Sequence, residues 1–324
     1  MGTVKVLDII GPGPLTTVQD LGRTGFGAYG VPPSGALDTF SLRTGNLLVG
    51  NPEDAAGLEI TLMGFRARAH CDMVVAVTGG DLQPRLNNVP LHMGTALSMK
   101  QGDLIEFKMA RTGCRAYLAI GGGIQVEPVM DSRSTNIGSG FGGLDGRALR
   151  KGDVLFSKNP QEHLTCTGEY MDADMMPAYT RKWSIRILWG PQDQDFSQKI
   201  REEFLNASFT VTSDSDRTGI RLKGPALPQK EGLATSIISE GIIPGAVQVP
   251  GNGQPIILLG ETVTGGYRKI ATVISVDLPL LGQMRPEDTV TFEAVSFHEA
   301  YEAIRQMETR ISAFKAKQLW RSRR

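Results

Sequence analysis

The chain has 324 residues, in which 34 Lys and Arg balance 34 Asp and Glu. This length accommodates one large domain or two ordinary ones, and the zero net charge offers no overall attraction for nucleic acid or for an anionic membrane, so we expect neither as a partner. The 39 glycines and 18 prolines exceed average usage and indicate many turns, which favours β structure.

The three cysteines, Cys71, Cys114 and Cys166, are odd in number and widely spaced, which is typical of buried thiols in a reducing cytosol. None of the four histidines stands in ligand spacing with a cysteine, and we expect no metal site. No apolar run has the length of a membrane span, and Met1–Gly13 lacks the pattern of a cleaved leader. These observations predict a cytoplasmic protein.

The first half begins with a predicted strand over Thr3–Ile10 and a helix over 35–49 that Ser34 is expected to cap. The intervening segment is rich in glycine, which permits a positive φ and close approach to a ligand. We interpret it as a shaped loop that holds charged and hydroxyl groups in place. These groups are Asp20, Arg23, Ser34 and Asp38.

Further apolar or alternating runs that end at glycine or at a charge predict strands. In chain order they are Met73–Thr78, Leu104–Met109, Arg115–Ile120, Ser184–Trp189, Phe209–Val211, Gly245–Val249, Ile256–Leu259, Ile270–Val276 and Thr289–Val295. Residues 159–176 are polar and aperiodic, and we expect them to connect two halves of the chain. Near the end, apolar residues at spacings of three and four predict an amphipathic helix, and the basic run 321–324 is expected to be a solvated end.

Two short motifs that occur twice in the chain favour two related halves. Asp20–Phe26 recurs as Asp214–Ile220, and Gly102–Phe107 is answered by Glu287–Phe292. Two motifs in the same order at similar offsets are weak evidence of duplication, because Lys151–Phe156 is a third copy of the second motif.

Several kinds of catalytic and nucleotide site are excluded. The chain has no Gly-x-Ser-x-Gly elbow and no Gly-x-x-x-x-Gly-Lys-Ser/Thr loop. Gly121–Gly123 follows a predicted strand but is not completed into a dinucleotide-binding turn and helix, so we interpret it as a turn or a close packing contact.

The strongest candidate for chemistry is a cluster of hydroxyls, guanidinium groups and glycines over 132–147. Arg grips a carboxylate or phosphate bidentately, and open backbone amides add donors, so the cluster predicts an oxyanion site. The alternative is a set of salt bridges that brace a loop. The candidate residues are Arg133, Ser134, Thr135, Gly142, Gly143 and Arg147.

Arg23 and Arg217 hold equivalent places in the two halves. One of them is a candidate to clamp substrate, while the other pairs with its neighbour, Asp20 or Asp214. The sequence leaves open which arginine does which.

A second candidate is Thr264–Tyr267, in which Gly265 and Gly266 precede Tyr267. A tyrosine hydroxyl on a glycine turn can donate to a developing oxyanion or carry a proton, although a tyrosine that caps a barrel end is an equal alternative. We take Tyr267 and Asp38 as catalytic candidates. Gln248 and Ser34 complete the predicted binding residues, and for Glu59 we favour a structural hydrogen bond.

These motifs resemble those of the KipA family, also called allophanate hydrolase subunit 2, biotin-dependent carboxyltransferase or the C subunit of 5-oxoprolinase. The resemblance extends to about residue 300 in separate motifs, which is more specific than any single pattern. The matching segments are 20–38, 46–52, 132–147, 214–219, 239–250 and 264–267. The chain departs from the family pattern at Asp131, usually Gly, at Val263, usually Thr, and at Arg268, usually Pro.

The resemblance implies a mainly β fold of two cyclophilin-like β-barrel domains, with a few short helices and a C-terminal amphipathic helix. Together with the repeated motifs, it predicts an N-terminal half over 1–175 that carries the glycine-rich loop, a C-terminal half over 176–312 and a basic tail over 313–324.

The resemblance also implies two enzymatic functions and one regulatory function. In the function that we favour, the chain works with a KipI-like and a LamB/YcsF-like subunit as an ATP-dependent 5-oxoprolinase, a hydrolase of a cyclic amide, with ATP bound here or by a partner subunit. In the second, a carboxyltransferase component moves a carboxyl group from carboxybiotin to urea and forms allophanate. In the third, the chain is a non-enzymatic partner that regulates a KipI-like kinase inhibitor. The sequence shows no biotinyl-lysine context, which favours the first.

Overall fold

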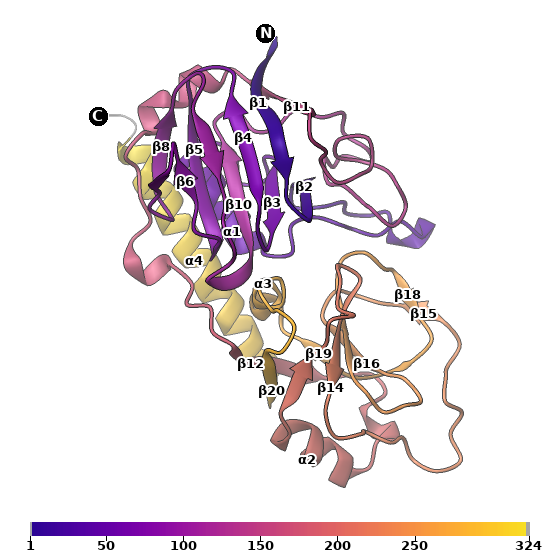
Figure 1. Cartoon of the computed structure of the whole chain (residues 1–324). Coiled ribbons are helices and arrows are strands. Elements are labelled where there is room, and N and C mark those ends of the chain that lie inside the picture. The colour runs from indigo at the N-terminus through magenta and orange to yellow at the C-terminus, as the bar shows by residue number, and fades with distance from the viewer. Residues whose placement is uncertain (1, 322–324) are drawn as a thin grey trace. The chain divides into compact units, whose positions relative to one another are not determined.

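The computed structural model describes residues 2–321, which form two compact units. The N-terminal unit contains residues 2–23, 34–179 and 309–321, and the C-terminal unit contains 24–33 and 180–308. Both units are built mainly from strands (Figure 1), which confirms the predicted mainly β fold. Within the described residues, no helix is both long and apolar enough to cross a membrane.

Two antiparallel sheets form the N-terminal unit. The order of the first is β11 (Val154–Lys158), β1 (Thr3–Pro12), β4 (Phe65–Ala69), β9 (Leu104–Glu106), β6 (Arg85–Leu86) and β7 (Val89–Pro90). The order of the second is β2 (Leu15–Gln19), β3 (Gly57–Thr61), β10 (Thr112–Ile120), β5 (Met73–Asp81) and β8 (Ala96–Met99). Both sheets contribute to one apolar core, in which the rings of Phe65 and Phe107 pack edge to face at 5.7 Å.

Helix α1 (Thr39–Leu48) begins later than predicted, and Asp38 rather than Ser34 is its N-cap. The Asp38 carboxylate accepts a hydrogen bond of 2.9 Å from the backbone N–H of Ser41, one of the donors that a helix start leaves unpaired. Ser34 and Gly35 have φ values of 55° and 87°, which are incompatible with a right-handed helix. The prediction of Ser34 as the cap was therefore wrong, because the backbone enters the helix only after Asp38.

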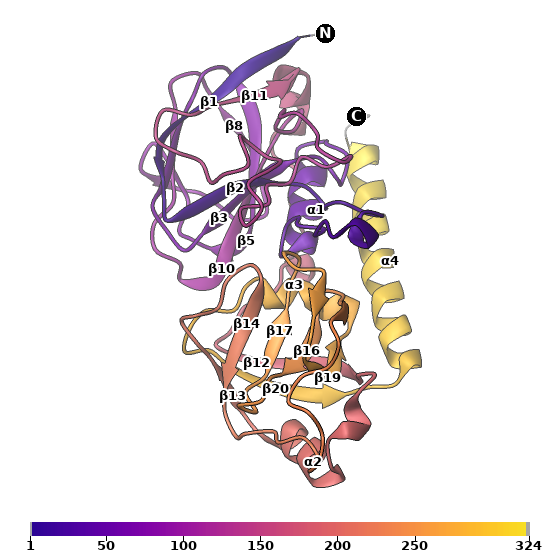
Figure 2. The same cartoon turned by 90° about the vertical axis from the view of Figure 1, so that its right-hand side faces the viewer.

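The C-terminal unit contains a closed barrel, whose strands Figure 2 shows. Their order is β12 (Lys182–Trp189), β19 (Arg268–Val273), β16 (Ala246–Val249), β17 (Ile256–Leu258), β14 (Gly219–Lys223), β13 (Phe209–Val211) and β20 (Thr289–Ala294). Phe204, from α2 (Gln198–Asn206), stacks on Phe292 with ring centres 4.4 Å apart. The unit also contains the short pair β15 (Glu240–Gly241) and β18 (Thr264–Gly265), and α3 (Leu278–Leu281).

The predicted strands correspond to described strands, whereas three other features differ from expectation. Residues 159–176, expected to be a connection, form the 3-10 helices η2 (Pro160–Cys166) and η3 (Ala173–Met175) within the N-terminal unit. Helix α2 was missed. The predicted C-terminal helix is α4 (Phe297–Arg321), which includes most of the segment expected to be a basic tail. Residues 322–324 of that tail lie outside the described residues.

Candidate functional site

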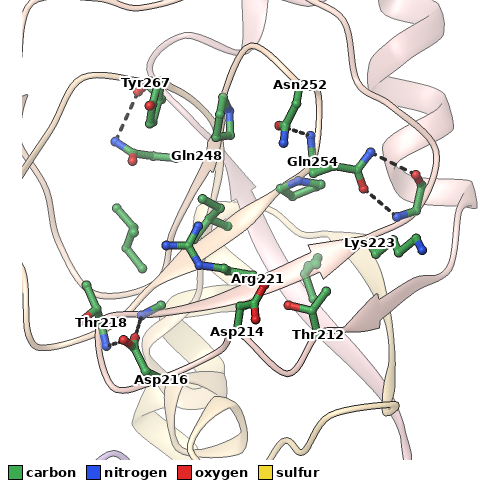
Figure 3. Close-up of a pocket in the computed structure, with 17 residues that line it drawn as sticks. Thr212, Asp214, Asp216, Thr218, Arg221, Lys223, Gln248, Asn252, Gln254 and Tyr267 are labelled. Atoms are coloured by element: carbon green, nitrogen blue, oxygen red, sulfur yellow. Dashed lines mark hydrogen bonds between the residues drawn. The ribbon is translucent and has the colours of Figure 1, made fainter.

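A pocket of about 800 Å³ lies in the C-terminal unit (Figure 3). Its walls come from strands β14, β16 and β17 and from the turns over 212–218 and 250–255, together with Tyr267. A volume of this size is within the range of small-molecule sites. The pocket brings together two predicted site residues, Gln248 and Tyr267.

Gln248 and Tyr267 are positioned by their backbone neighbours. The Gln248 amide is nearly buried, and its Nε2 donates to the Tyr267 carbonyl oxygen at 3.3 Å. Tyr267 is 40% exposed and lines the pocket. A Cβ atom at Gly265 would clash with Gln248 Nε2, so glycine is required there for the amide to take this position.

Arg221 and Lys223 are the pocket's basic side chains, and our sequence analysis missed them. They are exposed on β14, where they alternate with the buried Ile220 and Leu222. That alternation was the available signal, because it places both cations on one face of the strand. Among the described residues, neither cation forms an ion pair. Figure 3 shows Arg221 between Gln248 and Tyr267 on one side and Asp216 on the other.

The turn that precedes β14 is held by Asp216, whose Oδ1 accepts from the backbone N–H groups of Thr218 and Gly219 at 2.7 and 3.1 Å. Arg217, within this turn, is 5% exposed and ion-paired with Glu261 at 2.9 Å. Arg217 does not line the pocket. Its contacts support a bracing role for this arginine.

In the N-terminal unit, the predicted oxyanion cluster surrounds a carboxylate of the chain itself. Asp20, 8% exposed, accepts hydrogen bonds from the Ser132 and Ser134 hydroxyls and from the Arg133 backbone N–H. The N–H of Gly22 adds a further bond of 2.8 Å. The donor types that the sequence indicated for an anion are therefore present, and Asp20 is the anion that they hold.

The rest of this cluster forms a buried hydrogen-bonded network around Arg23. The Arg23 guanidinium donates to the carbonyl oxygens of Val129 and Ser134 and lies over the Phe141 ring at 4.6 Å. The Thr135 hydroxyl donates to the Val18 carbonyl oxygen at 3.0 Å. The network thus links the start of the glycine-rich loop to the 132–147 segment.

Ser34, Gly142 and Gly143 lie within the same network. The Ser34 hydroxyl accepts from Asn136 Nδ2 at 3.0 Å. A Cβ atom would clash with the Ser134 carbonyl oxygen if placed at Gly142, and with Thr135 Oγ1 if placed at Gly143. Both positions therefore require glycine for close packing, whatever further role their amides have.

Arg147 forms the loop-bracing salt bridge that the sequence left as an alternative. Its guanidinium is bidentate to Asp153, at 2.8 and 3.0 Å, and contacts Asp145 at 3.1 Å. The hydrogen bond from Arg147 lowers the pKa of the Asp153 carboxyl, against a smaller opposing effect of burial. This guanidinium is already neutralised within the fold.

Arg133 differs from the other predicted arginines of this unit. It lines a cavity of about 370 Å³ together with Lys158 and Asn51. Its Nε atom is buried and has no hydrogen-bond partner among the described residues. Arg133 therefore keeps N–H groups that could donate hydrogen bonds to an anion.

Asp38 and Glu59 belong to a buried polar network beside α1. The Asp38 carboxylate accepts from Ser41 Oγ at 2.7 Å and from Tyr179 Oη at 2.9 Å. Glu59 accepts from Tyr117 Oη at 2.7 Å, which fits the structural hydrogen bond expected of it. Burial, together with the Glu59 and Asp38 carboxylates, holds the pKa of Tyr117 well above its usual range, so this phenol stays protonated as a donor.

Over residues 29–294 the sequence matches the family described as the carboxyltransferase domain, subdomain A and B, and the chain belongs to this family. It is 39% identical over 302 residues to the C subunit of 5-oxoprolinase from Escherichia coli (strain K12), a match that covers 92% of this chain and 94% of the relative. It is 35% identical over 304 residues to the C subunit of 5-oxoprolinase from Haemophilus influenzae, with 94% and 96% covered. The resemblance stated from the motifs is confirmed.

A solved structure agrees with this assignment. The crystal structure of the K. lactis urea amidolyase superimposes with a TM-score of 0.89 at 32% sequence identity over 95% of this chain. This chain spans 20% of that protein. The chain therefore has the fold of the matching region of a much longer protein.

Proposed function

We propose that the chain is a subunit of an ATP-dependent 5-oxoprolinase complex, which converts 5-oxoproline, ATP and water to glutamate, ADP and phosphate. The observation that carries the proposal is the match to two relatives, each named as the C subunit of 5-oxoprolinase, over 94% and 96% of their own lengths. The identity to these two subunits, 39% and 35%, is higher than the 32% identity to the urea amidolyase, and this difference supports the subunit function.

The C-terminal pocket supplies groups suited to a lactam that carries a carboxylate. Arg221 and Lys223 can donate charge-assisted hydrogen bonds to the carboxylate, and Asp214 and Asp216 line the same pocket. The hydroxyl of Tyr267 can donate to the lactam carbonyl oxygen as charge develops on it, and the Gln248 amide can orient the ring. In the N-terminal unit, Arg133 is the candidate for holding an anion.

We assign ATP binding to a partner subunit, KipI-like or LamB/YcsF-like. Phosphate groups bind readily at helix N-termini with open backbone N–H groups, but the N-terminus of α1 is capped by the Asp38 carboxylate, and that of α2 by Ser197. Catalysis by Asp38 stays a prediction, because both of its oxygens accept hydrogen bonds within the fold.

Carboxyl transfer to urea with carboxybiotin is the second candidate. The TM-score of 0.89 to a urea amidolyase favours it, and the same pocket would then polarise the urea carbonyl. The test is to reconstitute the chain with its KipI-like and LamB/YcsF-like partners and to measure glutamate and ADP released from 5-oxoproline and ATP. In parallel, allophanate formation is measured with urea and carboxybiotin. Absence of 5-oxoproline-dependent ADP release from a stable complex would overturn the first proposal.

The pocket is tested separately in that complex. Tyr267→Phe removes one hydroxyl, and we expect turnover with 5-oxoproline to fall about 100-fold because one oxyanion donor is lost. Lys199→Gln, on the exposed face of α2 and outside the pocket, is the matched control and should leave turnover unchanged. Equal turnover in both variants would contradict the catalytic role of Tyr267 but would not contradict the proposal that the chain is a subunit of the complex.

A further inference from the structure

The N-terminal unit contains another cavity, of about 350 Å³, between the end of α1, helix η2 and the end of α4. Its lining includes Leu47, Leu48, His163, Cys166 and Gln318. None of the residues predicted from the sequence as site residues lines it, and the proposed function does not use it.

Gln318 is the most informative residue of this cavity. Its side chain is 7% exposed, and neither its Oε1 nor its Nε2 has a hydrogen-bond partner among the described residues. A buried carboxamide with both atoms unpaired is costly, and buried polar groups are nearly always paired in folded proteins. The amide faces a cavity large enough for a molecule that would pair it.

The geometry of the Gln318 carboxamide indicates which ligand group could pair with it. Gln318 presents one acceptor and one donor side by side, and a group with N–H next to C=O on one edge satisfies both with two parallel hydrogen bonds. This edge, a cis-amide, occurs in lactams, ureides and pyrimidine bases. Leu47 and Leu48 provide an apolar surface suited to a planar ring.

Two other residues of the cavity wall are His163, whose ring is held in orientation by a backbone carbonyl, and Cys166, whose thiol is uncharged. His163 Nδ1 lies 2.8 Å from the Val49 carbonyl oxygen, so this nitrogen carries the donated proton. Burial raises the pKa of the Cys166 thiol, so it stays protonated. A Cβ atom at Gly50 would lie 2.8 Å from Cys166 Sγ, so the absence of a side chain at Gly50 allows the thiol to pack closely against the backbone there.

The charges around the cavity disfavour an anion. Glu162 and Glu169 line it, while the ammonium of Lys315 is ion-paired with Glu53 at 2.9 Å. The lining carboxylates therefore outnumber the cation, and that cation is already neutralised.

We propose that this cavity is a second small-molecule site, which binds a planar, neutral or cationic compound through a cis-amide edge paired with Gln318. The inference is independent of the 5-oxoprolinase proposal. The two proposals also differ in ligand charge, because 5-oxoproline carries a carboxylate, which the lining Glu162 and Glu169 of this cavity disfavour.

The test uses the full chain and uracil as the probe, with binding measured by titration calorimetry. We expect saturable binding of uracil, no measurable binding of 1,3-dimethyluracil, which lacks the N–H, and weaker binding of the anion orotate. Gln318→Met keeps the length of the side chain and removes the amide, and it should weaken uracil binding at least tenfold. Gln161→Met, an exposed glutamine on η2 that does not line the cavity, is the matched control.

Absence of saturable uracil binding, or equal affinity in Gln318→Met and the control, would overturn the proposal. The Tm of the free variants gives an independent readout. Removing an unpaired amide should leave the Tm of Gln318→Met unchanged or raised, whereas a clear fall relative to Gln161→Met would show that Gln318 makes a structural hydrogen bond and would also overturn the proposal.

Discussion

Asp20 receives side-chain and backbone hydrogen bonds from three residues that follow it by 112 to 114 positions in the sequence. The bonds are charge-assisted and mostly excluded from water, which makes them stronger than bonds between neutral groups. At the scale of single residues, this carboxylate explains why two serines and an open backbone N–H gather at one point.

Replacement of this carboxylate tests its structural role. We expect Asp20→Asn to lower the free energy of unfolding by about 2 kcal/mol, because hydrogen bonds to a charged group are lost or weakened. Urea denaturation measures the change. Asp131→Asn, on an exposed residue of the same segment, is the control, and an equal effect of the two substitutions would contradict the role given to Asp20.

The Arg147–Asp153 pair makes a prediction about pH. The folded-state pKa of Asp153 is lowered by Arg147, below the value of about 3.9 for an unfolded Asp. The pair therefore contributes stability above that pH, and the contribution is lost as the pH falls through the folded-state pKa. Arg147→Met should cost about 1 kcal/mol at pH 7, and the difference from wild type should shrink below about pH 4. A pH-independent difference would argue against this pair.

At the scale of elements, the start of α1 depends on Asp38. We expect Asp38→Ala to destabilise the chain by about 2 kcal/mol through loss of the cap, and Asp38→Asn to be milder because asparagine also caps helices. The same variants separate capping from chemistry in the reconstituted complex. If Asp38→Asn keeps stability but loses turnover, the catalytic prediction for Asp38 gains support.

The β18 strand makes a second prediction at this scale. Gly265→Ala places a methyl group against the Gln248 amide, and we expect turnover of the complex to fall at least tenfold, about 1.4 kcal/mol, as the amide moves. Gly241→Ala, on the partner strand β15, meets nothing within 4 Å and is the matched control. Equal turnover in both variants would separate Gln248 from the active site.

The strands and helices that the sequence predicted correctly are those with a clear period of apolar residues. In β12, Trp183, Ile185 and Ile187 alternate inward with exposed or half-buried residues, and the strand was predicted. Helix α2 was missed although Ile200 and Phe204 stand four residues apart, because its nine residues are shorter than the window over which a helical period is recognised. Contacts such as that between Asp20 and Ser134 join residues 114 positions apart, and local pattern does not specify such pairings.

At the scale of the whole molecule, α4 supplies residues to the N-terminal unit from the other end of the chain. Ile311 and Phe314 are buried in it, at 1% and 3% exposure. Ile311→Ala should lower the free energy of unfolding by about 3 kcal/mol, because a buried side chain leaves a cavity. Tyr301→Ala, at a residue 64% exposed on the same helix, should change it by less than about 0.5 kcal/mol. Equal effects in urea denaturation would argue against this packing.

The position of residues 309–321 has a consequence for synthesis. The N-terminal unit begins with β1 at Thr3 and includes the last described turns of α4, so a ribosome must translate beyond residue 309 before that unit has all its parts. Until then, the nascent chain carries an unfinished apolar face while the barrel of the other unit is still emerging, and such a face is open to chaperones and to aggregation. A premature stop codon before position 309 would therefore impair the N-terminal unit, although most of its residues would already have been made.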